Sequence, residues 1–143
     1  RIYTNNMIDY KFENLFGVTY NSGNITFSKN TSENSPNPDL LYSPIGNKVS
    51  VFDIKNGTAQ TLDIESRSNI SLIEITKRNL LVSVDVDGFC VLVNLFKQVI
   101  IGHFNFRDKV SAIASSPCGK FLCVGVKNGV QIYELPKTMT KQI

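Results

Sequence analysis

Residues 46–54 read Gly-Asn-Lys-Val-Ser-Val-Phe-Asp-Ile, a tight-turn signal followed by an alternation of apolar and polar residues. Two later stretches repeat this order and end, like the first, on a bulky residue, a polar residue and an aliphatic residue. The three endings are spaced 41 and then 40 residues apart: Phe52-Asp53-Ile54, Val93-Asn94-Leu95 and Tyr133-Glu134-Leu135. The chain therefore repeats one structural unit three times.

Each stretch opens on a dipeptide that tolerates positive φ and can close a two-residue hairpin. These dipeptides are Gly46-Asn47, Asp87-Gly88 and Asn128-Gly129. A strand-turn-strand unit repeated about every forty residues is the signature of propeller blades. We therefore expect an all-β chain: a WD-repeat β-propeller fragment of about three antiparallel four-stranded blades in an incomplete ring.

Period-two apolar patterns predict twelve strands and almost no helix. The strands are expected at residues 16–20, 24–27, 40–43, 48–54, 59–64, 70–75, 80–84, 89–95, 98–104, 110–114, 121–126 and 130–135. In this arrangement the first strand has no inner partners of its own. The last repeat ends on the third strand of its blade, so that blade should lack its outer strand.

The predicted domain organisation places three WD repeats at residues 10–136, between flexible ends at residues 1–9 and 137–143. Residues 28–39 are rich in serine, asparagine and proline, which predicts a mobile loop insert. A propeller ring needs at least four blades. Because the first residue is Arg1 rather than methionine, we expect a fragment of a longer propeller rather than three repeats completed by another chain.

The composition is that of a soluble globular chain, with 42% hydrophobic residues, 19% charged residues and a net charge of +3. No apolar run approaches the roughly 20 residues that a membrane helix needs, so we expect no membrane contact. Three cysteines, an odd number, indicate a reducing compartment. Four Asn-X-Ser/Thr triplets occur, but in a chain this rich in asparagine we interpret them as accidental.

Several residues are predicted to hold the blades together. They are Phe52, Asp53, Asp87, Gly88, Val93, His103 and Tyr133. His103, the only histidine, follows Gly102, and we expect its ring to hydrogen-bond within the blade at a strand-to-blade turn. Asp85 and Asp87 lie beside a tight turn, where aspartate caps backbone amides.

The sequence shows no constellation that would carry chemistry. A lone histidine needs a nucleophile or carboxylate partner for catalysis. Cys118 and Cys123 lack the second pair of ligands that a zinc site requires. The scattered glycines form no phosphate loop before a helix. We therefore expect no enzyme, no catalytic residue, no metal and no cofactor.

Charge is distributed unequally between the two sets of turns expected on opposite faces of the propeller. On the first face, six basic residues oppose two acidic ones: Lys29, Lys55, Lys77, Arg78, Lys97 and Lys120 against Glu33 and Asp39. On the second, five oppose four: Lys48, Arg67, Arg107, Lys109 and Lys127 against Glu65, Asp85, Asp87 and Asp108. The balances are about +4 and +1, and a positive surface attracts phosphate chains. The first face is therefore the candidate for RNA or an acidic partner, although solvated loop lysines would give the same pattern.

A more specific likeness runs through stretches that blade geometry alone does not require. They are Tyr10-Lys-Phe-Glu-Asn-Leu-Phe-Gly-Val-Thr-Tyr20, Gly23-Asn-Ile-Thr-Phe-Ser28, Leu41-Tyr-Ser-Pro-Ile-Gly-Asn-Lys-Val-Ser-Val-Phe-Asp53, Asp85-Val-Asp-Gly88, His103-Phe-Asn-Phe106 and Ser116-Pro-Cys-Gly-Lys120. In these stretches the chain resembles the family of periodic tryptophan protein two, WD-repeat proteins of ribosome biogenesis.

The resemblance implies the N-terminal part of the first of two tandem propellers. The whole protein would be a nucleolar scaffold of the small-subunit processome, a ribonucleoprotein particle that processes pre-rRNA. Its partners would be other WD-repeat subunits of the same subcomplex, with pre-rRNA and small nucleolar RNA contacted directly or indirectly. The alternative is a generic intracellular WD-repeat adaptor, such as a ubiquitin ligase receptor or a peptide reader. In either case open blade edges should make the isolated chain self-associate.

Overall fold

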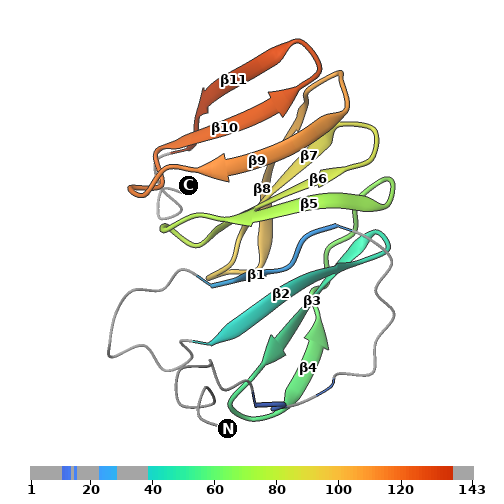
Figure 1. Cartoon of the computed structure of the whole chain (residues 1–143), viewed down its shortest axis with the longest axis vertical. Coiled ribbons are helices and arrows are strands. Elements are labelled where there is room, and N and C mark those ends of the chain that lie inside the picture. Colours follow the sequence, from blue (N-terminus) through green and yellow to red (C-terminus); the bar gives the residue numbers. More distant parts are fainter. Residues whose placement is uncertain (1–10, 14, 16–22, 29–38, 137–143) are drawn as a thin grey trace, which may run out of the picture.

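The computed structural model describes residues 11–13, 15, 23–28 and 39–136, where eleven strands form three antiparallel meanders (Figure 1). The first sheet comprises β1 (Thr26–Phe27), β2 (Leu40–Ile45), β3 (Lys48–Asp53) and β4 (Thr58–Thr61). The second comprises β5 (Ile70–Ile75), β6 (Leu80–Asp85), β7 (Phe89–Asn94) and β8 (Val99–Asn105). The third comprises β9 (Val110–Ser115), β10 (Phe121–Val126) and β11 (Gly129–Glu134). Within these ranges no helix is long and apolar enough to cross a membrane.

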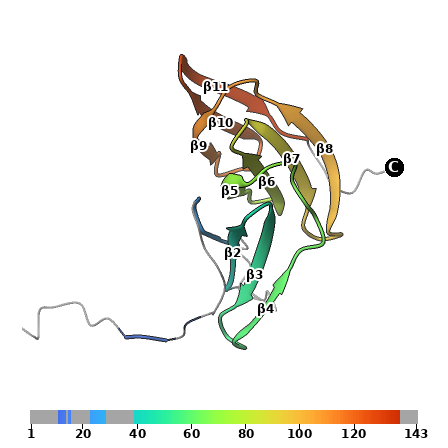
Figure 2. The same ribbon diagram turned by 90° about the vertical axis from the view of Figure 1, so that its right-hand side faces the viewer.

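The three sheets follow one another as neighbouring blades and do not close into a ring (Figure 2). The predicted fold, a three-blade fragment of a β-propeller, is therefore confirmed. In the described part of the chain the third blade has three strands, as its predicted ending on a third strand requires. The expected strand at residues 16–20, the loop insert except for its two end residues, and both expected flexible ends lie outside the described residues.

One of the three predicted hairpin turns has the expected length and position. Gly46 and Asn47 join β2 to β3, with Gly46 at a φ of +65°. Between β6 and β7 the loop instead has three residues, 86–88, and Gly88 ends it at a φ of +86°. Between β10 and β11 the turn is Lys127-Asn128, one residue earlier than predicted, because Gly129 already pairs with Val126.

Two hydrophobic clusters lie between neighbouring sheets. The cluster between the first and second sheets contains Tyr42, Leu62, Ile73 and Leu81 among others. The cluster between the second and third sheets is built around these side chains: Leu80, Val82, Val84, Leu122 and Val124. Successive residues of a strand point to opposite faces, so β6 contributes to both clusters and all six of its residues are buried. β6 is thus covered on both faces, whereas β8 at the outer edge of the same sheet is mostly exposed.

Polar side chains link the inner strands of adjacent blades. Asn24 accepts a hydrogen bond from the Ile73 amide and donates one to the Ile73 carbonyl, each 2.8 Å long. Glu74 accepts hydrogen bonds from both the amide and the hydroxyl of Ser115, at 3.0 and 2.7 Å. Both links start from β5, so its backbone and side chains position the first and third blades on either side.

Candidate interaction surfaces

Lys29 lies outside the described residues, and the other five basic residues predicted for the first face lie on turns between first and second, or third and fourth, strands of their blades. They are Lys55 on the β3–β4 turn, Lys77 and Arg78 on the β5–β6 turn, Lys97 on the β7–β8 turn and Lys120 before β10. Neighbouring turns are in contact. Thr58 and Gln98 line one cavity, and the Leu95 amide donates to the Asn79 carbonyl at 3.0 Å. The structure thus brings these turns together along one side of the blades.

Arg78 differs from the four lysines on this side. The lysines are exposed, whereas Arg78 is half-buried and packs against the turn that contains Gly119. A Cβ atom built at Gly119 would lie 3.1 Å from the Arg78 Cγ atom. The Lys120 ammonium lies 5.3 Å from the centre of the Phe121 ring. Arg78 therefore contributes to the contact between the second and third blades, and the lysines carry the charge available to a partner.

The turns on this side are held by side-chain oxygens of their own residues. The Thr76 hydroxyl accepts hydrogen bonds from the Arg78 and Leu80 amides, both 3.2 Å long. The Ser116 hydroxyl accepts one from the Phe121 amide at 3.0 Å in the next blade. Hydroxyl groups that bind nearby backbone amides stabilise turns. These hydrogen bonds therefore stabilise the β5–β6 and β9–β10 turns, which carry Lys77 and Lys120.

The three cysteines are free thiols with different environments. Burial, with a smaller contribution from Asp85, raises the pKa of Cys90 to about 12. The hydrogen bond with the Ser116 hydroxyl is the main cause that lowers the pKa of the exposed Cys118. Throughout the part of the chain that the structure describes, no three His, Cys, Asp or Glu side chains gather closely enough to hold a metal ion. The three thiols therefore share no disulfide and no metal-binding group in the described part of the chain.

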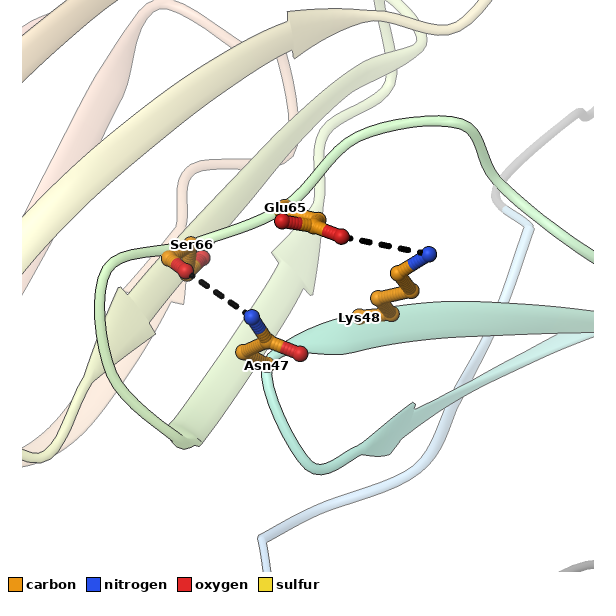
Figure 3. Close-up of polar contacts among 4 residues, drawn as sticks. All are labelled: Asn47, Lys48, Glu65 and Ser66. Atoms are coloured by element: carbon orange, nitrogen blue, oxygen red, sulfur yellow. Dashed lines mark hydrogen bonds and ion pairs between the residues drawn. The ribbon is translucent and has the colours of Figure 1, made fainter.

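On the other side of the blades, residues 62–69 connect the first sheet to the second and bind the β2–β3 turn. The Ser66 amide donates to the Asn47 carbonyl at 2.8 Å, and the Asn47 side chain donates to the Ser66 carbonyl at 3.2 Å (Figure 3). The Lys48 ammonium lies 3.3 Å from the Glu65 carboxylate (Figure 3). Sequence reasoning missed the first part of this connection, because the alternation of Leu62 and Ile64 extended the predicted strand to residue 64, whereas β4 ends at Thr61.

Asp85 and Asp87 have separate structural roles. The buried Asp85 carboxylate accepts hydrogen bonds from the Asp87 and Phe89 amides, 2.9 and 3.0 Å long. Asp87 accepts one from the Ser68 hydroxyl at 2.8 Å, which ties the β6–β7 turn to the connection between blades. The predicted interpretation of this pair as turn residues is therefore confirmed for the Asp85 cap, and Asp87 adds a link that the sequence did not predict.

The predicted role of His103 is wrong in its position. His103 lies in the middle of β8, opposite Val91, because β8 continues pairing with β7 as far as Asn105. Its ring packs against Phe89 at 5.6 Å between centroids and makes no hydrogen bond within the described ranges. The Arg67 guanidinium lies 4.0 Å from the centre of the same Phe89 ring. His103 therefore forms part of an aromatic and cationic cluster and does not pin a turn.

Phe52, Val93 and Tyr133 occupy equivalent positions. Each is the fifth residue of a six-residue third strand: β3, β7 or β11. Val93 is fully buried, Phe52 is 3% exposed and Tyr133 is half-buried. Asp53, which follows Phe52, accepts hydrogen bonds from the Asn56 amide and side chain at 3.1 and 2.8 Å. The repeat read from the sequence is thus a repeat in space.

No protein-family model matches the chain. Curated proteins do: Periodic tryptophan protein 2 of Saccharomyces cerevisiae is 41% identical over 129 residues, which are 90% of this chain. The chain is homologous to a segment of periodic tryptophan protein 2. The protein of that name from Arabidopsis thaliana is 37% identical over 90% of the chain, and the Mus musculus homologue is 33% identical over 89%. The chain spans only 13%, 14% and 13% of the lengths of these three relatives.

The similarity to periodic tryptophan protein 2 includes the lysine-bearing turns. The match over 129 residues, 90% of this chain, leaves about 14 of its 143 residues outside it, so its span includes all but about the first and last 15 positions. Lys55, Lys77, Lys97 and Lys120 all fall in that range. The side of the blades that carries them therefore belongs to the segment shared with periodic tryptophan protein 2.

Proposed function

We propose that this chain belongs to a non-enzymatic scaffold protein of ribosome biogenesis. The scaffold would support small-subunit pre-rRNA processing through protein and RNA contacts in the small-subunit processome, in the nucleolus. Its partners would be other WD-repeat subunits, pre-rRNA and small nucleolar RNA. The observation that carries the proposal is the 41% identity with Periodic tryptophan protein 2 over 90% of the chain. The packing of the blades supports the proposal. Their hydrophobic cores lie between the sheets, so the turns at the blade ends are available for contacts with partners.

Copurification from the source cells tests this function. The protein, tagged at its chromosomal locus, should recover processome proteins together with pre-rRNA and small nucleolar RNA, identified by mass spectrometry and RNA sequencing. The alternative, a generic WD-repeat adaptor, predicts ubiquitin ligase subunits or modified peptides and no enrichment of these RNAs. Recovery of that second set would contradict the scaffold proposal.

Reversing two exposed lysines should weaken RNA contact if the basic side faces RNA. The variant Lys77→Glu with Lys120→Glu should reduce RNA crosslinking of the intact protein about tenfold, because phosphate contacts dominate RNA affinity. The log–log slope of binding against salt concentration should become shallower by about 0.7 for each phosphate of a single strand that no longer meets a lysine.

The matched control is Lys109→Glu with Lys127→Glu, which makes the same charge change on exposed residues of the opposite turns. Crosslinking should be nearly unchanged in the control. An equal loss in both variants would show a response to overall charge and would remove the assignment of this side to RNA.

A further inference from the structure

A cavity of about 330 Å³ lies between the first and second blades, where β3 and β4 meet the β7–β8 turn. Its apolar wall includes Tyr42, Val51, Leu62 and Leu95. All four belong to the core cluster between these blades or pack against it. The shared core therefore reaches the surface at this cavity and offers an apolar wall to a side chain from outside.

The polar lining of the cavity can accept hydrogen bonds. Asp53 is its only charged residue, and Gln60 and Gln98 line it with exposed side chains. The Tyr42, Gln60 and Gln98 side chains make no hydrogen bond with any residue that the structure describes. Burial raises the pKa of Tyr42, so its phenol is neutral and able to accept as well as donate. Lys55 and Lys97 are close in sequence but do not line the cavity.

The Asp53 carboxylate is ionised, and neighbouring residues use only some of its hydrogen-bond acceptor positions. Hydrogen bonds from the Asn56 amide are the main cause that lowers its pKa, so it carries a negative charge at neutral pH. It accepts hydrogen bonds from the Asn56 backbone amide and side-chain amide, at 3.1 and 2.8 Å, and the Lys55 amide and ammonium contribute less to the same lowering of its pKa. An ionised carboxylate offers about four lone-pair positions. The remaining positions can therefore receive donors of a ligand.

Beside the cavity, β4 is an edge strand. It pairs with β3, all four of its residues are exposed, and no strand within the described ranges pairs with its other edge (Figure 2). An unpaired edge presents backbone donors and acceptors to another chain. Extended peptides bind such edges through backbone hydrogen bonds, while alternate side chains enter neighbouring pockets. Thr58 and Gln60, which share one face of β4, both line the cavity.

We propose that the groove formed by the cavity and the adjoining free edge of β4 binds an extended segment of a partner protein. This segment pairs with β4 and places an arginine side chain in the cavity. The aliphatic part of arginine suits the wall of Tyr42, Val51 and Leu95, and its five N–H donors face the Asp53 carboxylate and the amide oxygens of Gln60 and Gln98. An acidic side chain in the cavity would be repelled by the Asp53 carboxylate. This site goes beyond the proposed RNA-facing scaffold role.

The test measures fluorescence anisotropy of a labelled, capped pentapeptide, Thr-Val-Arg-Val-Thr, with the intact protein. A second peptide carries citrulline instead of arginine, which keeps the shape and removes the charge. The arginine peptide should bind at least about tenfold more tightly. Asp53→Asn should reduce this preference below about twofold, because asparagine still caps the turn but carries no charge. Gln98→Lys, an independent variant, should also weaken the arginine peptide.

Asp63→Asn is the matched control, since Asp63 is exposed and adjoins Leu62 but does not line the cavity. It should leave the preference unchanged. Equal binding of both peptides would overturn the proposal, as would an equal effect of Asp63→Asn. Displacement of the peptide by a uridine oligonucleotide would show instead that the groove binds RNA. The copurification of processome components stands or falls independently of these results.

Discussion

Replacing Gly88 with alanine is expected to destabilise the protein by about 4 kcal/mol or more, which only a few mechanisms achieve in a single substitution. Gly88 ends the β6–β7 loop at a φ of +86°, and a Cβ atom built there overlaps the backbone carbonyl oxygen of Asp108. The Gly88 carbonyl also accepts a hydrogen bond from the Phe106 amide at 2.9 Å. The connection from β8 to β9 would have to move away, and that hydrogen bond would break.

Gly46→Ala is the matched control for this prediction. Gly46 also has a positive φ, +65°, but the nearest atom to its added Cβ is the Asn69 Oδ1 atom at 3.8 Å. It therefore carries only the left-handed backbone cost of about 1–2 kcal/mol. Thermal unfolding of the intact protein, with hydrogen exchange of the Phe106 amide, compares the two. Equal destabilisation would mean that the approach of Asp108 has no special weight.

Truncating Leu81 to alanine should cost about 2–5 kcal/mol, because the substitution removes buried apolar atoms and leaves a cavity. Leu81 is 1% exposed and lies in the cluster between the first and second blades. Leu80 is equally buried but belongs to the cluster between the second and third blades. The two substitutions therefore remove the same number of atoms from opposite faces of β6.

Hydrogen exchange by mass spectrometry separates the two effects. Leu81→Ala should increase exchange mainly in β2 and β3, and Leu80→Ala mainly in β10. Phe96→Ala, at a side chain 74% exposed, should change stability by less than about 0.5 kcal/mol. Identical exchange patterns for Leu80→Ala and Leu81→Ala would contradict the separate clusters.

The sequence predicted those features that depend on local pattern. The equivalence of Phe52, Val93 and Tyr133 follows from alternation and a constant spacing, and the structure confirms it. The position of His103 was predicted wrongly because a Gly-His pair suggested a turn, whereas pairing with β7 carries β8 through it. The length of the β6–β7 loop was also missed, because glycine is common in both two-residue and three-residue hairpin loops.

The candidate sites depend on which blades meet, and that information is not local. The packing of Arg78 against Gly119 joins turns 41 residues apart. The cavity beside Asp53 needs Gln98 from the next blade. From charge alone, the sequence placed Arg78 with the lysines. From the repeat, it predicted only a structural role for Asp53. The contact between sheets shows that Arg78 is packed whereas the lysines are exposed. It also places Asp53 at the wall of a cavity.

The sharing of each core between two blades has a consequence for synthesis on the ribosome. A newly made blade cannot cover its apolar faces until the next blade has emerged, and translation at about 5–20 residues per second makes that wait about 2–8 seconds for a repeat of about forty residues. During this interval the side of β6 that carries Leu80, Val82 and Val84 has no cover. Nascent chains of this protein should therefore be chaperone clients at each blade boundary.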